Sequence, residues 1–184
     1  MSKIAVFFPG IGYHTDKPLL YHARKLADEV GYQEQILVNY VYDGGNIKGN
    51  PQLMREAFEI LYAQAEEQLS KLSWETYDDI LFVSKSIGTV IATQYAIKHQ
   101  ITGKNVFYTP LEQTLCEGMP EGVAFSGLKD PWVNPGEVKI LCGKHKIPLY
   151  TYPKANHSLE TGDTFENLRI LVDVMEKIRQ YLAE

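Results

Sequence analysis

A chain of 184 residues with a formal net charge of −5 shows no electrostatic footprint for nucleic acid, because its 18 lysines and arginines are scattered. No apolar run approaches the roughly 18 residues of a membrane span, and the run between Lys3 and Pro9 is too short for a signal-peptide core. The two cysteines, Cys116 and Cys142, form neither a disulfide framework nor a paired metal-ligand spacing. These features predict a cytoplasmic protein without a metal, in which both cysteines pack as small apolar residues.

Six short apolar runs alternate with segments of helical periodicity along the chain. The runs cover residues 3–8, 34–40, 79–84, 105–109, 122–127 and 147–152. The helical patterns cover residues 16–30, 51–72, 86–99, 135–145 and 163–182. Continuous apolar strands separated by helices indicate βαβ units, in which helices cover both faces of a parallel sheet. The sequence therefore predicts a single α/β domain over residues 1–184, with three α/β/α layers and a six-stranded, mainly parallel sheet of order 2-1-3-4-5-6.

Capping residues mark where three of these helices should begin. Asn50 precedes Pro51, and Asp16 precedes Pro18 at a similar spacing. Proline is favoured at the first helical position, and Asn or Asp before it can accept the free N–H groups of the first turn. Asp163 is expected to cap the last helix in the same way.

The predicted third strand runs into a corner with unusual chemistry. The spacing of Ser84, Ser86 and Gly88 matches the G-x-S-x-G nucleophile elbow, with serine in place of the first glycine. In an elbow the hydroxyl of Ser86 projects from a tight turn, and the backbone N–H of Ile87 helps to hold an oxyanion. The alternative is that Ser86 simply caps the following helix, as serine commonly does.

The loop after the first strand should meet this corner, because the first and third strands are neighbours in the predicted order. Gly10 and Gly12 flank Ile11, so the backbone N–H of Ile11 is a candidate second oxyanion donor. The alternative is an ordinary strand-to-helix turn. A dinucleotide-binding loop is disfavoured, since Thr15 stands where the third glycine of that motif is needed.

An acid and a base follow the fifth and sixth strands. Asp130 follows the fifth strand, although an Asp-Pro sequence is also a frequent turn. His157 is the only histidine that follows a strand end on the correct side of the sheet. Of the other four, His22 and His99 lie on helical patterns and are expected to be solvated, His145 ends a helix, and His14 lies in the loop after the first strand. The chain order is thus nucleophile, acid, histidine.

With this order, the sequence resembles the α/β-hydrolase superfamily. The resemblance runs over nearly the whole chain, from FFPGIGY through FVSKSIGT and SGLKDPW to ANHSLE. It implies a small serine hydrolase without the two leading antiparallel strands, without a cap domain and without a cofactor. Carried over by position, Ser86 resembles the nucleophile, Asp130 the acid and His157 the base, and Ile11 and Ile87 resemble the oxyanion donors. Ser84 for glycine and Pro9-Gly10 for the common His-Gly pair are departures from the family pattern.

The predicted activity is cleavage of a small ester or thioester through an acyl-enzyme, by a monomer or small homo-oligomer acting on a small molecule. An acyltransferase with the same triad and a non-catalytic binding module of the same fold are the alternatives.

The predicted pocket walls, besides Asn134 and the 43–50 loop, are Gly12, Tyr13, His14, Lys85, Trp132 and Leu159. Lys85, Lys129 and Lys154 flank the candidate catalytic positions and are interpreted as solvated loop lysines. The alternative is that their positive charges favour an anionic substrate. An open crevice bounded by loops 10–15, 43–50 and 131–134 would favour short acyl chains.

Overall fold

The strands form one parallel sheet in the computed structural model, which describes residues 2–184. The strands are β1 (Lys3–Phe8), β2 (Glu34–Leu37), β3 (Asp79–Lys85), β4 (Lys104–Tyr108), β5 (Val123–Gly127) and β6 (Leu149–Tyr152). Their order is β2-β1-β3-β4-β5-β6, and all neighbouring pairs are parallel. The predicted strand order is confirmed.

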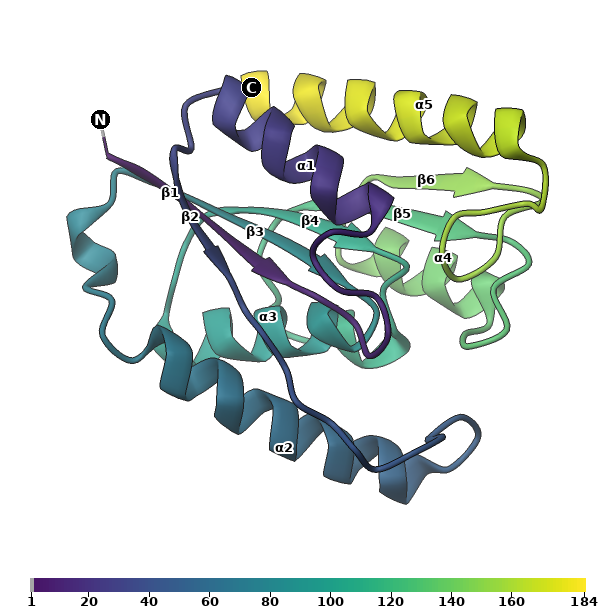
Figure 1. Cartoon of the computed structure of the whole chain (residues 1–184), viewed down its shortest axis with the longest axis horizontal. Coiled ribbons are helices and arrows are strands. Elements are labelled where there is room, and N and C mark those ends of the chain that lie inside the picture. The colour runs from purple at the N-terminus through teal and green to yellow at the C-terminus, as the bar shows by residue number, and fades with distance from the viewer. Residues whose placement is uncertain (1) are drawn as a thin grey trace.

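Helices cover both faces of the sheet, as continuous apolar strands require. Figure 1 shows α1 (Pro18–Glu29) and α5 (Thr164–Ala183) on one face, and α2 (Pro51–Leu69) and α3 (Ile87–His99) on the other. The remaining helix, α4 (Pro135–Lys144), packs on the β4 and β5 side chains of that second face. Two short 3₁₀ helices, η1 (Trp74–Thr76) and η2 (Glu112–Thr114), lie in the connections. This is the predicted three-layer architecture.

The apolar core has two main parts because successive strand side chains point to opposite faces. In β3, Ile80 and Phe82 pack in the cluster that contains α2 and α3. Leu81 and Val83 pack in the cluster that contains α1 and α5. Residues 87–93 of α3 are all buried, since α3 lies between the sheet and α2.

Two of the three predicted helix caps are confirmed. The Asn50 side chain accepts hydrogen bonds from Gln52 and Leu53, and the Asp163 side chain accepts one from Glu166. The prediction for Asp16 was wrong. Helix α1 begins after Lys17, which makes no side-chain cap, and the Asp16 carboxylate pairs instead with Arg24 at 2.9 Å.

β2 is shorter than the predicted 34–40 strand. The Val38 N–H still donates to the Phe7 carbonyl of β1 at 3.0 Å, and from Asn39 on the chain follows α2 instead of the sheet. Gln68 accepts from the Asn39 N–H and donates to its carbonyl, both at 2.9 Å. Gln64 does the same for Val41, both at 2.8 Å. Two glutamine amides on α2 therefore replace the neighbouring strand as hydrogen-bond partners.

Cys142 is buried and Cys116 is partly buried, and both are free thiols. Among the residues that the structure describes, there is no helix with the length and apolar character needed to cross a membrane.

Candidate active site

The corner between β3 and α3 has the geometry of a nucleophile elbow. Ser86 has φ 56° and ψ −125°, a backbone conformation that residues other than glycine seldom adopt. A Cβ added to Gly88 would lie 2.3 Å from the carbonyl oxygen of Phe8, so only glycine lets α3 pass this close to β1. The alternative role of Ser86 as a helix cap is not observed, because its side chain makes no cap hydrogen bond. Ser84 is fully buried, and its hydroxyl donates to the Val106 carbonyl at 3.1 Å.

Ser86, His157 and Asp130 form a continuous hydrogen-bonded chain. The Ser86 Oγ lies 2.7 Å from His157 Nε2, and His157 Nδ1 lies 2.6 Å from Asp130 Oδ2. The other Asp130 oxygen accepts the Trp132 N–H at 2.8 Å, so the predicted Asp-Pro turn and the interaction with histidine coexist. The Asp130 side chain has no exposed area. The three residues predicted from separate strands thus meet at the carboxyl edge of the sheet.

Backbone hydrogen bonds hold the loops that carry the acid and the histidine together. The N–H of Leu128 donates to Tyr152 at 3.0 Å, and the N–H of Lys129 donates to Ala155 at 2.9 Å. Within the histidine loop, the Asn156 side chain accepts the N–H groups of Ser158 and Glu160, at 2.7 and 3.2 Å. The position of His157 relative to Asp130 is therefore set largely by main-chain contacts.

The surroundings of His157 favour its neutral form. Burial lowers the pKa of His157, and the nearby positive charges of Lys85 and Lys48 lower it further. The hydrogen bond and negative charge of Asp130 act in the opposite direction, but the net shift is downward. A neutral imidazole with a hydrogen-bonded Nδ1 can accept a proton at Nε2.

The loop after β1 lies directly against the elbow. A Cβ added to Gly10 would lie 3.1 Å from the Ser86 Cβ. Gly10 and Tyr13 exchange two backbone hydrogen bonds at 3.1 and 3.2 Å, which closes a turn over Ile11 and Gly12. Gly12 has φ +72°, the conformation for which such a turn needs glycine. Within residues 2–184, the structure gives no hydrogen-bond acceptor to the N–H of Ile11 or of Ile87.

A cavity of about 900 Å³ opens beside Ser86. Of the residues predicted to line it, Gly12, Tyr13, Lys85 and Trp132 do so, as do residues 45–47 of the 43–50 loop. His14, Leu159 and Asn134 are outside the lining. His14 is exposed beside Asp16, Leu159 is buried in the core beneath α5, and Asn134 caps α4.

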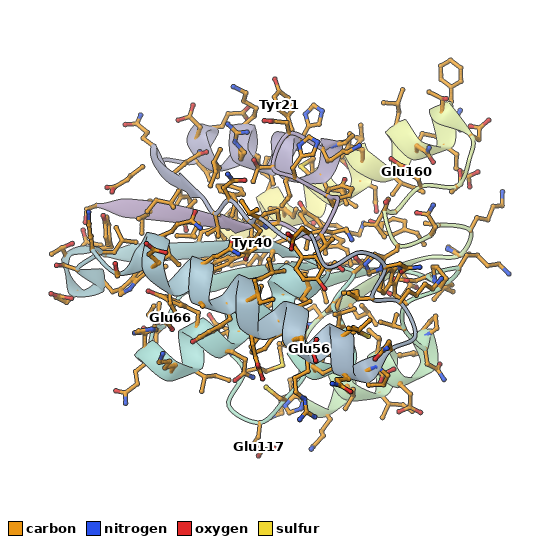
Figure 2. The ribbon with its side chains drawn as sticks, turned by 60° about the horizontal axis from the view of Figure 1, so that its bottom comes forward. Tyr21, Tyr40, Glu56, Glu66, Glu117 and Glu160 are labelled. Carbon is orange, nitrogen blue, oxygen red and sulfur yellow. The ribbon has the colours of Figure 1, made fainter. Side chains whose placement is uncertain are left out.

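One wall of the cavity was missed by sequence reasoning. The first turns of α2 and α3, with the segment after β4, contribute the apolar side chains of Met54, Phe58, Val90 and Leu111. Arg55 and Glu59 add charged groups on the same helix, α2. Figure 2 labels Glu56 in the first turns of α2 and Glu160 in the loop that carries His157, so both sides of the site can be located. Met54 and Phe58 are four residues apart and share one helix face, which is the only signal the sequence offered.

The interpretation of Lys85 as a solvated lysine was wrong. Its side chain is fully buried, its Nζ donates to the Thr109 hydroxyl at 2.6 Å, and the Tyr13 ring centre lies 5.1 Å from Nζ. Lys129 and Lys154 are exposed, as predicted. Within residues 2–184, no group of three or more His, Cys, Asp or Glu side chains is arranged to hold a metal ion.

Comparisons with known proteins identify the fold. No family model and no curated protein matches the chain. A candidate α/β hydrolase from Agrobacterium tumefaciens is 18% identical with a TM-score of 0.68, over 99% of this chain and 84% of that one. An esterase from Pyrococcus furiosus is 10% identical with a TM-score of 0.64, over 99% and 83%. A lid-less α/β serine hydrolase from Xanthomonas campestris is 12% identical with a TM-score of 0.58, over 97% and 79%. The chain has the α/β-hydrolase fold.

Proposed function

We propose that the chain is a serine hydrolase that cleaves a small ester or thioester through an acyl-enzyme on Ser86. The observation that carries this proposal is the hydrogen-bonded chain from Ser86 through His157 to the buried Asp130, at the edge of a cavity of about 900 Å³. The solved structures of similar fold include a protein named as an esterase and one named as a serine hydrolase, which supports a hydrolytic activity.

In the first half of the reaction, Ser86 Oγ attacks the carbonyl carbon while His157 Nε2 takes the hydroxyl proton. The carbonyl electron pair moves to oxygen, where the N–H groups of Ile11 and Ile87 stabilise the negative charge. Collapse of this intermediate restores the carbonyl and expels the alcohol or thiol, which takes the proton from His157. Asp130 keeps the other imidazole proton on Nδ1 and stabilises the imidazolium.

In the second half, water replaces the departed alcohol or thiol. His157 takes a proton from water as its oxygen attacks the acyl carbonyl, and the same two N–H groups hold the oxyanion. Breakdown releases the carboxylic acid and returns the proton to Ser86. No step requires a group beyond these residues and water.

The cavity also bears on substrate size. The apolar wall of Met54, Phe58 and Val90 offers a surface for an acyl chain, and each buried methylene contributes up to about 0.8 kcal/mol. Turnover should therefore improve over the first added carbons. Chains longer than the wall would extend into solvent and gain nothing more.

Labelling with a fluorophosphonate probe tests the nucleophile directly. We expect the Ser86→Ala variant to lose both labelling and ester turnover, because the probe and the substrate need the same hydroxyl. The matched control is Ser84→Ala, which should label like the natural chain, since Ser84 is buried and bonded to Val106. Labelling that persists in Ser86→Ala would refute the proposal.

The reaction type and acyl preference are tested with esters and thioesters of about two to sixteen carbons. We expect kcat/KM to rise with chain length and then to level off at about eight carbons, because the methylene gain ends where the apolar wall ends. Met54→Ala should flatten the rise and leave the turnover of acetyl substrates nearly unchanged. A profile that rises steadily to sixteen carbons would contradict the proposed small substrate.

A further inference from the structure

Lys85 is a buried charged side chain that the mechanism above does not use. It immediately precedes Ser86 at the end of β3, and its side chain has no exposed area. Among residues 2–184, no carboxylate lies within ion-pairing distance of its Nζ. Its one hydrogen bond is to a neutral hydroxyl, that of Thr109. A buried ammonium without a direct counter-charge is costly, so its presence calls for a physical reason.

The residues that surround Lys85 hold it in place. Tyr13 presents the face of its ring, with its centre 5.1 Å from the Nζ, which is a favourable position for a cation. Thr109 receives the ammonium at 2.6 Å from a backbone with φ 42°, which is strained for a β-branched residue. Strain of this kind persists where the surrounding structure imposes it, and it is concentrated at functional sites.

Lys85 is electrostatically coupled to two residues of the candidate triad, Asp130 and His157. The negative charge of Asp130 raises the pKa of Lys85, although burial lowers it more strongly, to about 7. The positive charge of Lys85 in turn lowers the pKa of His157. Lys48, from the 43–50 loop, acts on His157 in the same direction. Arg55 and Glu59 reach the same cavity from α2, and Tyr13 stays neutral because burial raises its pKa to about 12.

We propose that Lys85 is a positioning residue, whose buried ammonium balances the carboxylate of Asp130 and holds His157 in the neutral form that accepts the Ser86 proton. This role rests on the proposed hydrolase function, because only a hydrolase needs His157 as a base. The electrostatic coupling between Lys85 and His157 can be measured whether or not the chain is a hydrolase. An ammonium close to an imidazole disfavours the imidazolium. Lys85 therefore keeps the base competent on the acidic side of neutrality, where the lysine itself carries its proton.

The decisive experiment compares Lys85→Met with the natural chain by NMR titration of the His157 ring nitrogens. We expect the His157 titration to move to higher pH in Lys85→Met, because the repelling charge is gone. The ratio of kcat/KM at about pH 6 to that at about pH 8 should fall by roughly threefold or more. The matched control is Lys129→Met, one residue from Asp130 but exposed, which should change neither quantity. An unchanged His157 titration in folded Lys85→Met would overturn the proposal.

A second measurement uses the natural chain alone, so it does not depend on whether Lys85→Met folds. In the natural chain, the His157 ring titration should show a second inflection where Lys85 loses its proton, as followed by the lysine ε-carbon resonance. A single inflection, independent of that lysine, would overturn the proposal. If no ester or thioester is hydrolysed but the coupling is present, the hydrolase proposal fails and the charge coupling stands. If esters are hydrolysed and the coupling is absent, the role of Lys85 fails alone.

Discussion

The two walls of the cavity are built in different ways. The wall that carries Ser86, Asp130 and His157 is fixed by strand ends, main-chain hydrogen bonds between loops and a helix packed against β1. The opposite wall consists of residues 45–47 and the first turns of α2. The segment that leads to it from β2 is held to the last turns of α2 by the side-chain amides of Gln64 and Gln68. One wall thus depends on the backbone of the sheet, and the other depends on replaceable side chains.

This difference indicates where change is tolerated. Altering the first wall disturbs strand packing, whereas altering the second replaces partly exposed contacts on one helix. A fold that hosts many activities needs this division, because function is set by the loops and side chains around a constant scaffold. We therefore expect substitutions in the first wall to affect rate or folding strongly, and substitutions in the second wall to affect substrate preference.

The strongest test of the first wall is Asp130→Asn. We expect kcat to fall by about 10⁴-fold, because an asparagine amide disfavours the imidazole tautomer that leaves Nε2 free to take a proton. The measurement is steady-state turnover of the best ester. Asp163→Asn is the control, since Asp163 caps α5 and asparagine caps equally well, so turnover should be unchanged. Loss of activity in the control variant, with activity retained in Asp130→Asn, would reverse the assignment of the acid.

A second test concerns the backbone of the elbow. Gly88→Ala should lower the free energy of unfolding by about 2 kcal/mol or more, because the new Cβ would lie 2.3 Å from a carbonyl oxygen that cannot move freely. Urea unfolding measures this change. Gly143→Ala in α4 is the control: its Cβ meets nothing within 4 Å, so the change should stabilise the helix by up to about 1 kcal/mol. Equal effects at the two glycines would show that the elbow is not tightly packed.

The free energy of unfolding of the protein should also depend on pH, because Lys85 is buried in the first wall. Burial lowers the pKa of Lys85 from 10.5 to about 7, so between these values the unfolded chain holds a proton that the folded chain has lost. Stability relative to Lys85→Met is therefore lowest below about pH 7 and increases up to about pH 10, by an amount on the order of a few kcal/mol. Urea unfolding of both proteins across this range measures it. A difference that stays constant with pH would show that the buried lysine keeps its proton up to the same pH as in the unfolded chain, so that burial does not lower its pKa.

The smallest effects are expected in the second wall. The double variant Gln64→Ala with Gln68→Ala removes four hydrogen bonds to the segment after β2, each contributing about 1 kcal/mol at most because the site is exposed. We expect KM to rise by several-fold while kcat and probe labelling change little. Gln180→Ala, an exposed glutamine near the end of α5, is the control. A large fall in kcat in the double variant would mean that the two walls are not separable.

The sequence was sufficient to predict the fold and to predict that Ser86, Asp130 and His157 lie close together. Parallel strands place their carboxyl ends at one edge, so a residue just after a strand has a nearly defined position. The caps of α2 and α5 were predicted for a similar reason, because Asn50 and Asp163 act on residues two or three positions away. Helix caps depend on residues that are close in the sequence, and strand order follows from the alternation of apolar strands and helices. Both can therefore be predicted from the sequence.

What the sequence did not reveal depends on contacts between distant segments. Lys85 was assigned to solvent because lysine is rarely buried, and its partners Thr109 and Tyr13 belong to other strand ends. The early end of β2 depends on Gln64 and Gln68, whose amides give no periodic signal. The cavity wall of α2 forms because its first turns lie opposite residues of α3 and of the segment after β4, which are distant in the sequence. No single segment encodes any of these features.

The position of Trp132 gives the site an optical reporter of its own. Its ring lies 5.6 Å from the His157 ring, while the other tryptophan of the chain, Trp74, packs against Phe82 and Tyr95 ahead of β3. An imidazolium quenches indole emission more strongly than a neutral imidazole does. In a Trp74→Phe background, the intrinsic fluorescence should therefore fall as His157 takes up a proton. The protonation state of the proposed base could then be followed continuously, without a label and without a substrate.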